Sequence, residues 1–225
     1  MNKNNINFLS GDWAFIFDMD GLMLDSERVS NWAWMESARE FGYELPESAL
    51  IPCLGQALLV FERTQKQLFG EEYPFEKVWD RKVELFNEFA EQKGIPLKTG
   101  LSCLLDLLDS HEIKKAVASS TGRTQVEKRL KITNLMHRFE VIVTGDEVQQ
   151  VKPAPDLFLE SAHKLKVNPD CCVVLEDSPH GVEAAIAAGM PVFLVPDIIP
   201  IPEKIKSQVI GIYQTLEDVA REIKN

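Results

Sequence analysis

The stretch FIFDMDGLMLDSE, from Phe15 to Glu27, decides the fold, because it joins an apolar run to two aspartates. Asp18 and Asp20 stand two residues apart directly after that run. Carboxylates repel one another and prefer water, so their position at the mouth of a hydrophobic strand needs a physical reason. They could be turn residues, calcium ligands, or a catalytic pair whose repulsion another group cancels.

The composition is that of a soluble globular protein. The 225 residues are 45% hydrophobic and 26% charged, with a formal net charge of −11. No run reaches the ~18 apolar residues of a membrane span, and the N-terminus lacks the apolar region of a secretory signal. Nucleic-acid binding usually shows as a basic patch. We therefore expect a cytoplasmic protein with no membrane or nucleic-acid partner, present as a monomer or weak dimer.

The cysteines give no sign of a metal or redox site. None of the four forms a C-x-x-C pair, and two are adjacent. We predict that they are reduced residues that fill the core. They are Cys53, Cys103, Cys171 and Cys172.

Short, nearly continuous apolar runs recur along the chain between helical patterns. Strands that are apolar on both faces are typical of a parallel sheet covered by helices on each side. Alternation of strand and helix then predicts a doubly wound, Rossmann-like α/β sheet. The expected strands are residues 13–17, 114–119, 140–145, 171–176 and 191–196.

One interval breaks this alternation. Between Leu24 and Pro96 the sequence has only helical patterns, and some seventy residues are too many for a loop. We predict an inserted all-helical cap domain at 26–95. The α/β core domain would then be discontinuous, formed by 1–25 and 96–225.

Polar residues follow the ends of the expected strands. Ligands of open α/β sheets bind beyond the carboxyl ends of the strands, so these side chains should meet at one edge. Hydroxyl groups end the second strand, a lysine precedes the fourth, and two carboxylates end the fourth. These residues are Ser119, Ser120, Lys152, Glu176 and Asp177.

Each of these residues also has a structural explanation on its own. Asp and Gly suit turns, and acidic residues cap helices. The calcium-loop interpretation fails, because counting from Asp18 places Met23 and Val29 where an EF-hand needs Gly and Glu. A chance gathering of all the polar residues at one edge is much less plausible than a shared function.

The chemistry follows from charge. Three or four carboxylates within a few ångströms cannot all stay ionised unless a cation neutralises them. Oxygen ligands favour Mg²⁺, which commonly binds one or two carboxylates and a substrate phosphate. Carboxylates, a lysine and hydroxyl donors around such an ion suit phosphoryl transfer.

Four segments resemble the motifs of the haloacid dehalogenase (HAD) superfamily. They are FDMDGLMLDSE, VASSTGR, VKPAPDLF and VVLEDSPHGVEAAIAAGM, in the family's order along nearly the whole chain. The helical insert resembles the cap of the β-phosphoglucomutase-like phosphatase branch. The resemblance implies a HAD core with a helical cap.

The resemblance also implies roles for the site residues. Asp18 would be the nucleophile that becomes phospho-aspartate, and Asp20 the general acid and base. Ser119, with Ser120 and backbone N–H groups, would bind the phosphate, and Lys152 would offset its charge. Mg²⁺ would be held by Asp18, Asp20 through its carbonyl, Asp177, and Glu176 directly or through water.

In the helical insert the chain differs from β-phosphoglucomutase, the mutase of this branch. A cap arginine of the mutase, close after a glycine, holds a second phosphate; here Gln56 and Ala57 follow Gly55, and Arg63 lies much further along. The mutase histidine after the first motif is also missing. Without the second phosphate grip, hydrolysis is favoured. Gln56 is a candidate substrate contact from the cap.

We therefore predict a phosphoric monoester hydrolase: a Mg²⁺-dependent phosphatase acting on a small phosphorylated metabolite, a sugar phosphate or a nucleoside monophosphate. The first alternative is a phosphosugar mutase on the same scaffold. A remote alternative is a phospho-aspartate signalling receiver, although receivers are shorter and lack a helical insert.

Overall fold

A computed structural model describes residues 7–10, 12–56 and 58–224 of the chain. The backbone divides into two compact units. One consists of Met1–Leu24 with Pro96–Asn225, and the other of Asp25–Ile95. The predicted insert, 26–95, begins one residue later than the second unit.

The first unit is built on a six-stranded sheet in the order β3-β2-β1-β4-β5-β6, and every pairing is parallel. The predicted α/β fold class is therefore confirmed. The sixth strand is only two residues long and was not predicted. The strands are β1 Ala14–Phe17, β2 Lys114–Ser119, β3 Val141–Thr144, β4 Cys172–Glu176, β5 Val192–Leu194 and β6 Gly211–Ile212.

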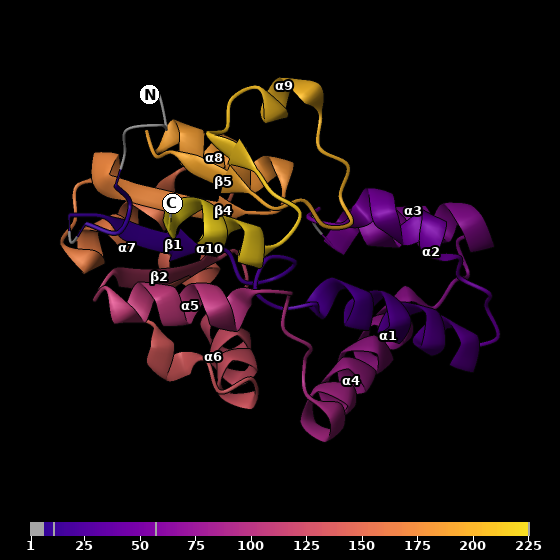
Figure 1. The fold of residues 1–225 in the computed structure, drawn as a ribbon. Coiled ribbons are helices and arrows are strands. Elements are labelled where there is room, and N and C mark those ends of the chain that lie inside the picture. The colour runs from indigo at the N-terminus through magenta and orange to yellow at the C-terminus, as the bar shows by residue number, and fades with distance from the viewer. Residues whose placement is uncertain (1–6, 11, 57, 225) are drawn as a thin grey trace. The chain divides into compact units, whose positions relative to one another are not determined.

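Helices lie on either side of this sheet (Figure 1). The helices are α5 Leu101–Ser110, α6 Arg123–Ile132, α7 Asp156–Leu165, α8 Pro179–Ala187, α9 Glu203–Lys206 and α10 Leu216–Lys224, with 3₁₀ turns η3 Met136–Arg138, η4 Gly145–Glu147 and η5 Pro169–Cys171. Pro155 is the N-cap of α7, and α8 is formed mostly by small residues.

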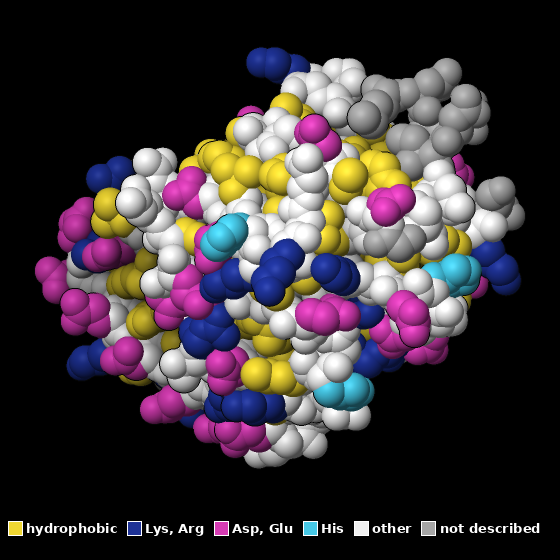
Figure 2. Space-filling view, turned by 90° about the vertical axis from the view of Figure 1, so that its left-hand side faces the viewer, with side chains coloured by type: hydrophobic (Ala, Val, Ile, Leu, Met, Phe, Trp, Pro, Cys, Tyr) yellow, Lys and Arg dark blue, Asp and Glu magenta, His cyan; other side chains and the backbone are white. Residues whose placement is uncertain are grey.

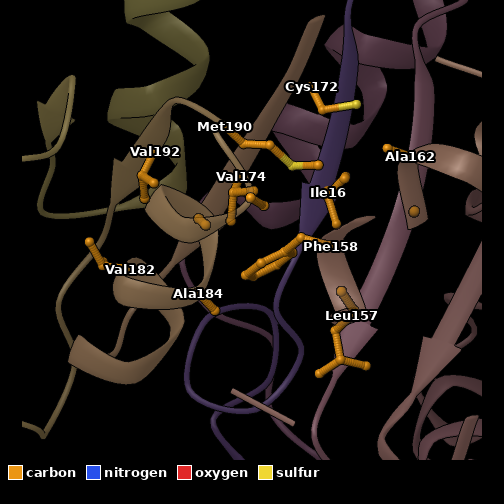
Figure 3. Close-up of a cluster of buried hydrophobic side chains, with 14 of the residues drawn as sticks. Ile16, Leu157, Phe158, Ala162, Cys172, Val174, Val182, Ala184, Met190 and Val192 are labelled. Atoms are coloured by element: carbon orange, nitrogen blue, oxygen red, sulfur yellow. The ribbon is translucent and has the colours of Figure 1, made fainter. Parts of the chain in front are cut away.

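A buried apolar cluster joins α7 and α8 to one face of the sheet. Figure 3 shows Phe158 of α7 beside Ile16 of β1 and Val174 of β4, with Ala184 of α8 nearby. All four side chains are fully buried. Burial of this apolar surface fixes the central strands, and with them the loops at their ends.

The strand order places a topological switch point at β1. The chain passes from β1 to β2 and β3 on one side, and then returns to β4 on the other side of β1. Ligand crevices of doubly wound sheets form at such a point, beyond the carboxyl ends of the strands.

In the described residues of the second unit, helices joined by short turns and loops are the regular structure. Its core is aromatic: the Trp34 ring stacks on Phe61 at a centroid distance of 5.5 Å and also contacts Phe75 and Trp79. Its elements are α1 Ser26–Glu40, α2 Glu47–Leu50, η2 Ile51–Cys53, α3 Leu58–Phe69 and α4 Phe75–Lys93.

The cysteine prediction is only half right. Cys53 and Cys172 are buried, as expected of core residues, and all four thiols are free. Cys103 is exposed and Cys171 is half-buried. Cys103 lies on α5, where the leucine side chains provide the buried face, so the cysteine points away from the core.

Acidic and basic side chains are interspersed over the face shown in Figure 2. Among the helices that the structure describes, none combines the length and the apolar character needed to cross a bilayer.

Candidate active site

Asp18 and Asp20 lie at the carboxyl end of β1, beside β4. The Asp18 N–H donates to the Leu175 carbonyl at 3.1 Å, so the ladder between the two strands continues to this residue. The loop then turns back at Gly21, which has φ +89°. The Asp18 carboxylate is thus held by the sheet and not by a flexible loop.

Lys152 ties three strand ends together. Its side-chain ammonium donates to Asp18 Oδ1, to Glu176 Oε1 at 2.6 Å and to the Ala118 carbonyl at 3.0 Å. The Lys152 side chain is only 6% exposed. A single buried cation therefore bridges the ends of β1, β2 and β4.

Glu176 is fully buried and uses both carboxylate oxygens within the protein. Oε1 accepts from Lys152, and Oε2 accepts from the backbone N–H groups of Asp177 and Ser178 at 2.9 and 3.0 Å. A Cβ on Gly181 would lie 1.8 Å from Oε1, so only glycine fits in that turn of α8. Metal binding by Glu176 stays a prediction.

Asp177 packs against the loop that follows β1. Its side chain is buried, and a Cβ on Gly21 would lie 2.3 Å from Asp177 Oδ2. The glycine therefore serves two needs, a positive φ and the close approach of a carboxylate. This contact brings the fourth motif to the first.

The hydroxyl residues after β2 take different positions. Ser119 is buried, and its Oγ accepts from the Thr121 N–H at 3.1 Å. Ser120 is exposed. Thr121 Oγ1 donates to Asp20 Oδ2 at 3.0 Å, and Arg129 Nη1 donates to Asp20 Oδ1 at 2.5 Å.

Sequence reasoning missed the contacts of Thr121 and Arg129 with Asp20. Thr121 lies inside the second motif, so its position at the strand end was a usable signal. Arg129 had none, since it is one of 24 Lys and Arg residues and lies on a largely polar helix.

Burial and charge act against each other in this cluster. Burial raises the pKa of Asp18 well above its usual range, and the positive charge of Lys152 opposes that rise. Burial alone would lower the pKa of Lys152, but the charges of Asp18 and Glu176 outweigh it and raise that pKa. The lysine therefore stays charged at neutral pH, whereas ionised Asp18 needs further positive charge nearby.

The oxygen atoms at this edge fit a hard cation. In the described parts of the chain, no three or more His, Cys, Asp and Glu side chains form a metal-binding group. Mg²⁺, however, commonly takes only one or two carboxylates from a protein. Asp18 and Asp177 are buried carboxylates, and Asp177 contacts the loop that carries the Asp20 carbonyl. These residues fit Mg²⁺ better than a softer metal.

Gln56 lies in the helical unit. It is exposed, and its backbone N–H donates to the Cys53 carbonyl at 2.9 Å. Its predicted contact with substrate stays a prediction. The neighbouring Ala57, part of the same sequence comparison, lies outside the described residues.

Known proteins are similar to this chain in sequence and in fold. A phosphorylated carbohydrates phosphatase of Thermotoga maritima is 32% identical over 189 residues, 79% of this chain and 82% of that protein. The fructose-1-phosphate phosphatase YqaB of Escherichia coli is 33% identical over 184 residues, 79% and 93% of the two chains. A solved structure from T. maritima, provisionally named a β-phosphoglucomutase, has a TM-score of 0.81 at 27% identity and covers 94% and 98% of the chains.

The sequence profile of the haloacid dehalogenase-like hydrolases matches residues 15–195, which contain all four motifs. The predicted membership and the predicted class of enzyme, a hydrolase related to phosphatases, are confirmed. This chain belongs to the haloacid dehalogenase-like hydrolase family.

Proposed function

We propose that this protein is a Mg²⁺-dependent phosphatase that hydrolyses a small phosphorylated metabolite through a phosphoryl group on Asp18. The observation that carries the proposal is the buried contact of Lys152 with both Asp18 and Glu176, at the switch point of the sheet. Two relatives named for the hydrolysis of carbohydrate phosphates support a sugar phosphate as substrate, and a nucleoside monophosphate is the alternative.

The proposed reaction has two displacements at phosphorus. An Asp18 oxygen attacks the phosphorus, the bond to the leaving oxygen breaks, and Asp20 gives that oxygen its proton. Water then attacks the same phosphorus, Asp20 takes a proton from the water, and inorganic phosphate leaves. Asp18 and Asp20 return to their starting states. When bound, Mg²⁺ would offset the negative charge that a phosphate adds to these carboxylates.

The remaining residues have supporting roles in the proposal. Ser119 and the backbone at Ser120 would donate hydrogen bonds to the phosphate oxygens. Lys152 would balance the charge of the phosphoryl group on Asp18. Asp177, the carbonyl of Asp20 and the Asp18 carboxylate would hold Mg²⁺.

A screen of phosphate release tests the proposal. Purified protein is incubated with sugar phosphates and nucleoside monophosphates, with Mg²⁺ and with a chelator. We expect release from a subset of these esters that depends on Mg²⁺ and is absent in Asp18→Asn. Undiminished turnover in the chelator, or in the Asn variant, would contradict the mechanism.

A phosphosugar mutase remains the second candidate, because a structural relative carries that name. Incubation with β-glucose 1-phosphate separates the two activities. We expect inorganic phosphate to form faster than glucose 6-phosphate, since this sequence has neither the arginine nor the histidine of the mutase at the matching positions. The reverse order would assign a mutase.

A further inference from the structure

The Asp20 carboxylate is held at both oxygens by one segment of the chain. Thr121 Oγ1 donates to Oδ2 at 3.0 Å, and Arg129 Nη1 donates to Oδ1 at 2.5 Å. Thr121 lies in the turn after β2, and Arg129 lies on α6, which begins two residues after that turn residue. The two donors therefore reach Asp20 from a single connected support.

That support is anchored in the core. Val126 and Leu130 of α6 are fully buried on either side of Arg129 in sequence. The Arg129 side chain is 18% exposed and that of Asp20 is 24% exposed. For comparison, the surface pair Arg221–Glu217 is 65% and 43% exposed, and it joins residues one turn apart on the same helix. The Arg129–Asp20 pair instead links α6 to the loop after β1.

The two donors differ chemically, and this difference distinguishes the two oxygens of Asp20. A guanidinium group donates hydrogen bonds but cannot accept one. In a protonated carboxyl group the carbonyl oxygen is a better acceptor than the hydroxyl oxygen, so the contact with Arg129 favours Oδ1 as the carbonyl oxygen. A hydroxyl both donates and accepts, so Oδ2, which faces Thr121, can hold a proton without losing its contact.

We propose that Arg129 and Thr121 are positioning residues that orient Asp20 so that Oδ2 is the oxygen that transfers the proton. The inference rests on the proposed phosphatase function and specifies how the Asp20 carboxyl group is oriented for proton transfer. In the first displacement, the Oδ2–H bond breaks and the proton passes to the leaving oxygen as the phosphorus–oxygen bond breaks. Oδ1 stays on Arg129 throughout.

Two esters with different leaving groups test this role. Nitrophenolate is a stable anion and leaves without a proton, whereas the alkoxide of a sugar phosphate needs one. The ratio kcat/KM reports the steps up to loss of the leaving group, so slow hydrolysis of phospho-Asp18 does not affect it. The probes are p-nitrophenyl phosphate and fructose 1-phosphate; if the unsubstituted protein does not hydrolyse fructose 1-phosphate, the fastest alkyl ester in the screen replaces it.

We expect Arg129→Met to lower kcat/KM for the sugar phosphate by about 10- to 100-fold and that for p-nitrophenyl phosphate by less than about 3-fold, since general acid catalysis contributes about 10²–10⁴. Arg129→Lys, which keeps the charge, should recover part of the loss, and Thr121→Val should show the same selectivity. If a substitution lowered the fraction of folded protein, kcat/KM would fall equally for both esters. The ratio of the two kcat/KM values therefore stays informative even for a destabilised variant.

Arg138→Met is the matched control. The Arg138 side chain is also 18% exposed and binds the carboxylates of Asp106 and Asp109, but it precedes β3, at the opposite end of the sheet. We expect this variant to affect both esters equally. An equal loss on both esters in Arg129→Met, or no loss, would overturn the inference. No phosphate release from any ester by the unsubstituted protein would instead overturn the proposed function.

Discussion

Substitution of Gly21 by alanine should disable the site while leaving the fold in place. The new Cβ would lie 2.3 Å from Asp177 Oδ2, whereas ordinary contact begins at 3.4 Å. The Asp177 carboxylate would therefore have to move by the difference, 1.1 Å. The residue also has φ +89°, a region that costs an L-residue about 1–2 kcal/mol.

The displacement should appear mainly in Mg²⁺ dependence and turnover. Misplacement by about 1 Å can cost ~10²-fold in rate, and loss of a supporting contact costs about 10–100-fold in metal affinity. We expect kcat/KM for an alkyl phosphate to fall by about 10²-fold and the Mg²⁺ concentration for half activity to rise at least ~10-fold. The assays are phosphate release against Mg²⁺ concentration and denaturant unfolding of the metal-free protein.

Gly189→Ala separates backbone strain from this contact. Gly189 also has a positive φ, +75°, but nothing lies within 4 Å of the position that a Cβ would take there. The Gly189→Ala protein should lose about as much free energy of unfolding as Gly21→Ala, but its dependence on Mg²⁺ concentration should stay that of the unsubstituted protein. If Gly21→Ala and Gly189→Ala had the same kcat/KM and needed the same Mg²⁺ concentration for half activity, then the contact between Gly21 and Asp177 would not matter for Mg²⁺ binding or turnover.

Three other predictions follow from burial. Asp18→Asn should stabilise the metal-free protein at pH 8 and not near pH 4. Burial raises the pKa of Asp18 in the folded state, so the contribution of Asp18 to stability is present below the unfolded value of about 3.9 and is lost as the pH rises through the folded pKa. Thermal unfolding in chelator at both pH values checks this. Phe158→Ala should lower the free energy of unfolding by about 3–5 kcal/mol, against less than ~1 kcal/mol for the exposed Leu159→Ala, as measured by urea denaturation. Cys103 should react with a thiol reagent in the native protein, whereas Cys172, whose pKa burial raises to about 12, should react only on unfolding; mass spectrometry of labelled peptides distinguishes them.

The strands that could be predicted are those buried on both faces, because their sequences are continuous apolar runs. β1 and β4 are buried at every residue, and both were expected from their apolar sequence. β6 was missed because two residues, Gly211–Ile212, carry no pattern that distinguishes a strand from a loop. The exposure of Cys103 was missed for a related reason: the face of a helix is set by its neighbours, which here are leucines.

The site was predictable to the extent that strand ends converge. Asp18, Lys152 and Glu176 were expected at one edge, and the structure places their side chains in contact. The contacts that support this cluster could not be predicted in the same way. Gly181 looks like an ordinary small residue until the Glu176 carboxylate is found in the space of its missing side chain. Arg129 is recognisable only once α6 is docked beside the loop after β1.

Lys152 indicates how the site can be both stable and reactive. An ammonium has three N–H donors, and here they go to Asp18, Glu176 and the Ala118 carbonyl. To bond a phosphate oxygen directly, the lysine would have to release one of these partners, and release of Glu176 would leave a fully buried charge with one fewer donor. In the proposed reaction the Asp18 contact is the one that would change, because the attacking carboxylate would lose its charge on becoming an acyl phosphate. Lys152 would then be able to turn toward the phosphoryl oxygens while its contacts with Glu176 and Ala118 keep it in position. The residue that stabilises the unphosphorylated cluster would in this way also stabilise the phosphorylated one.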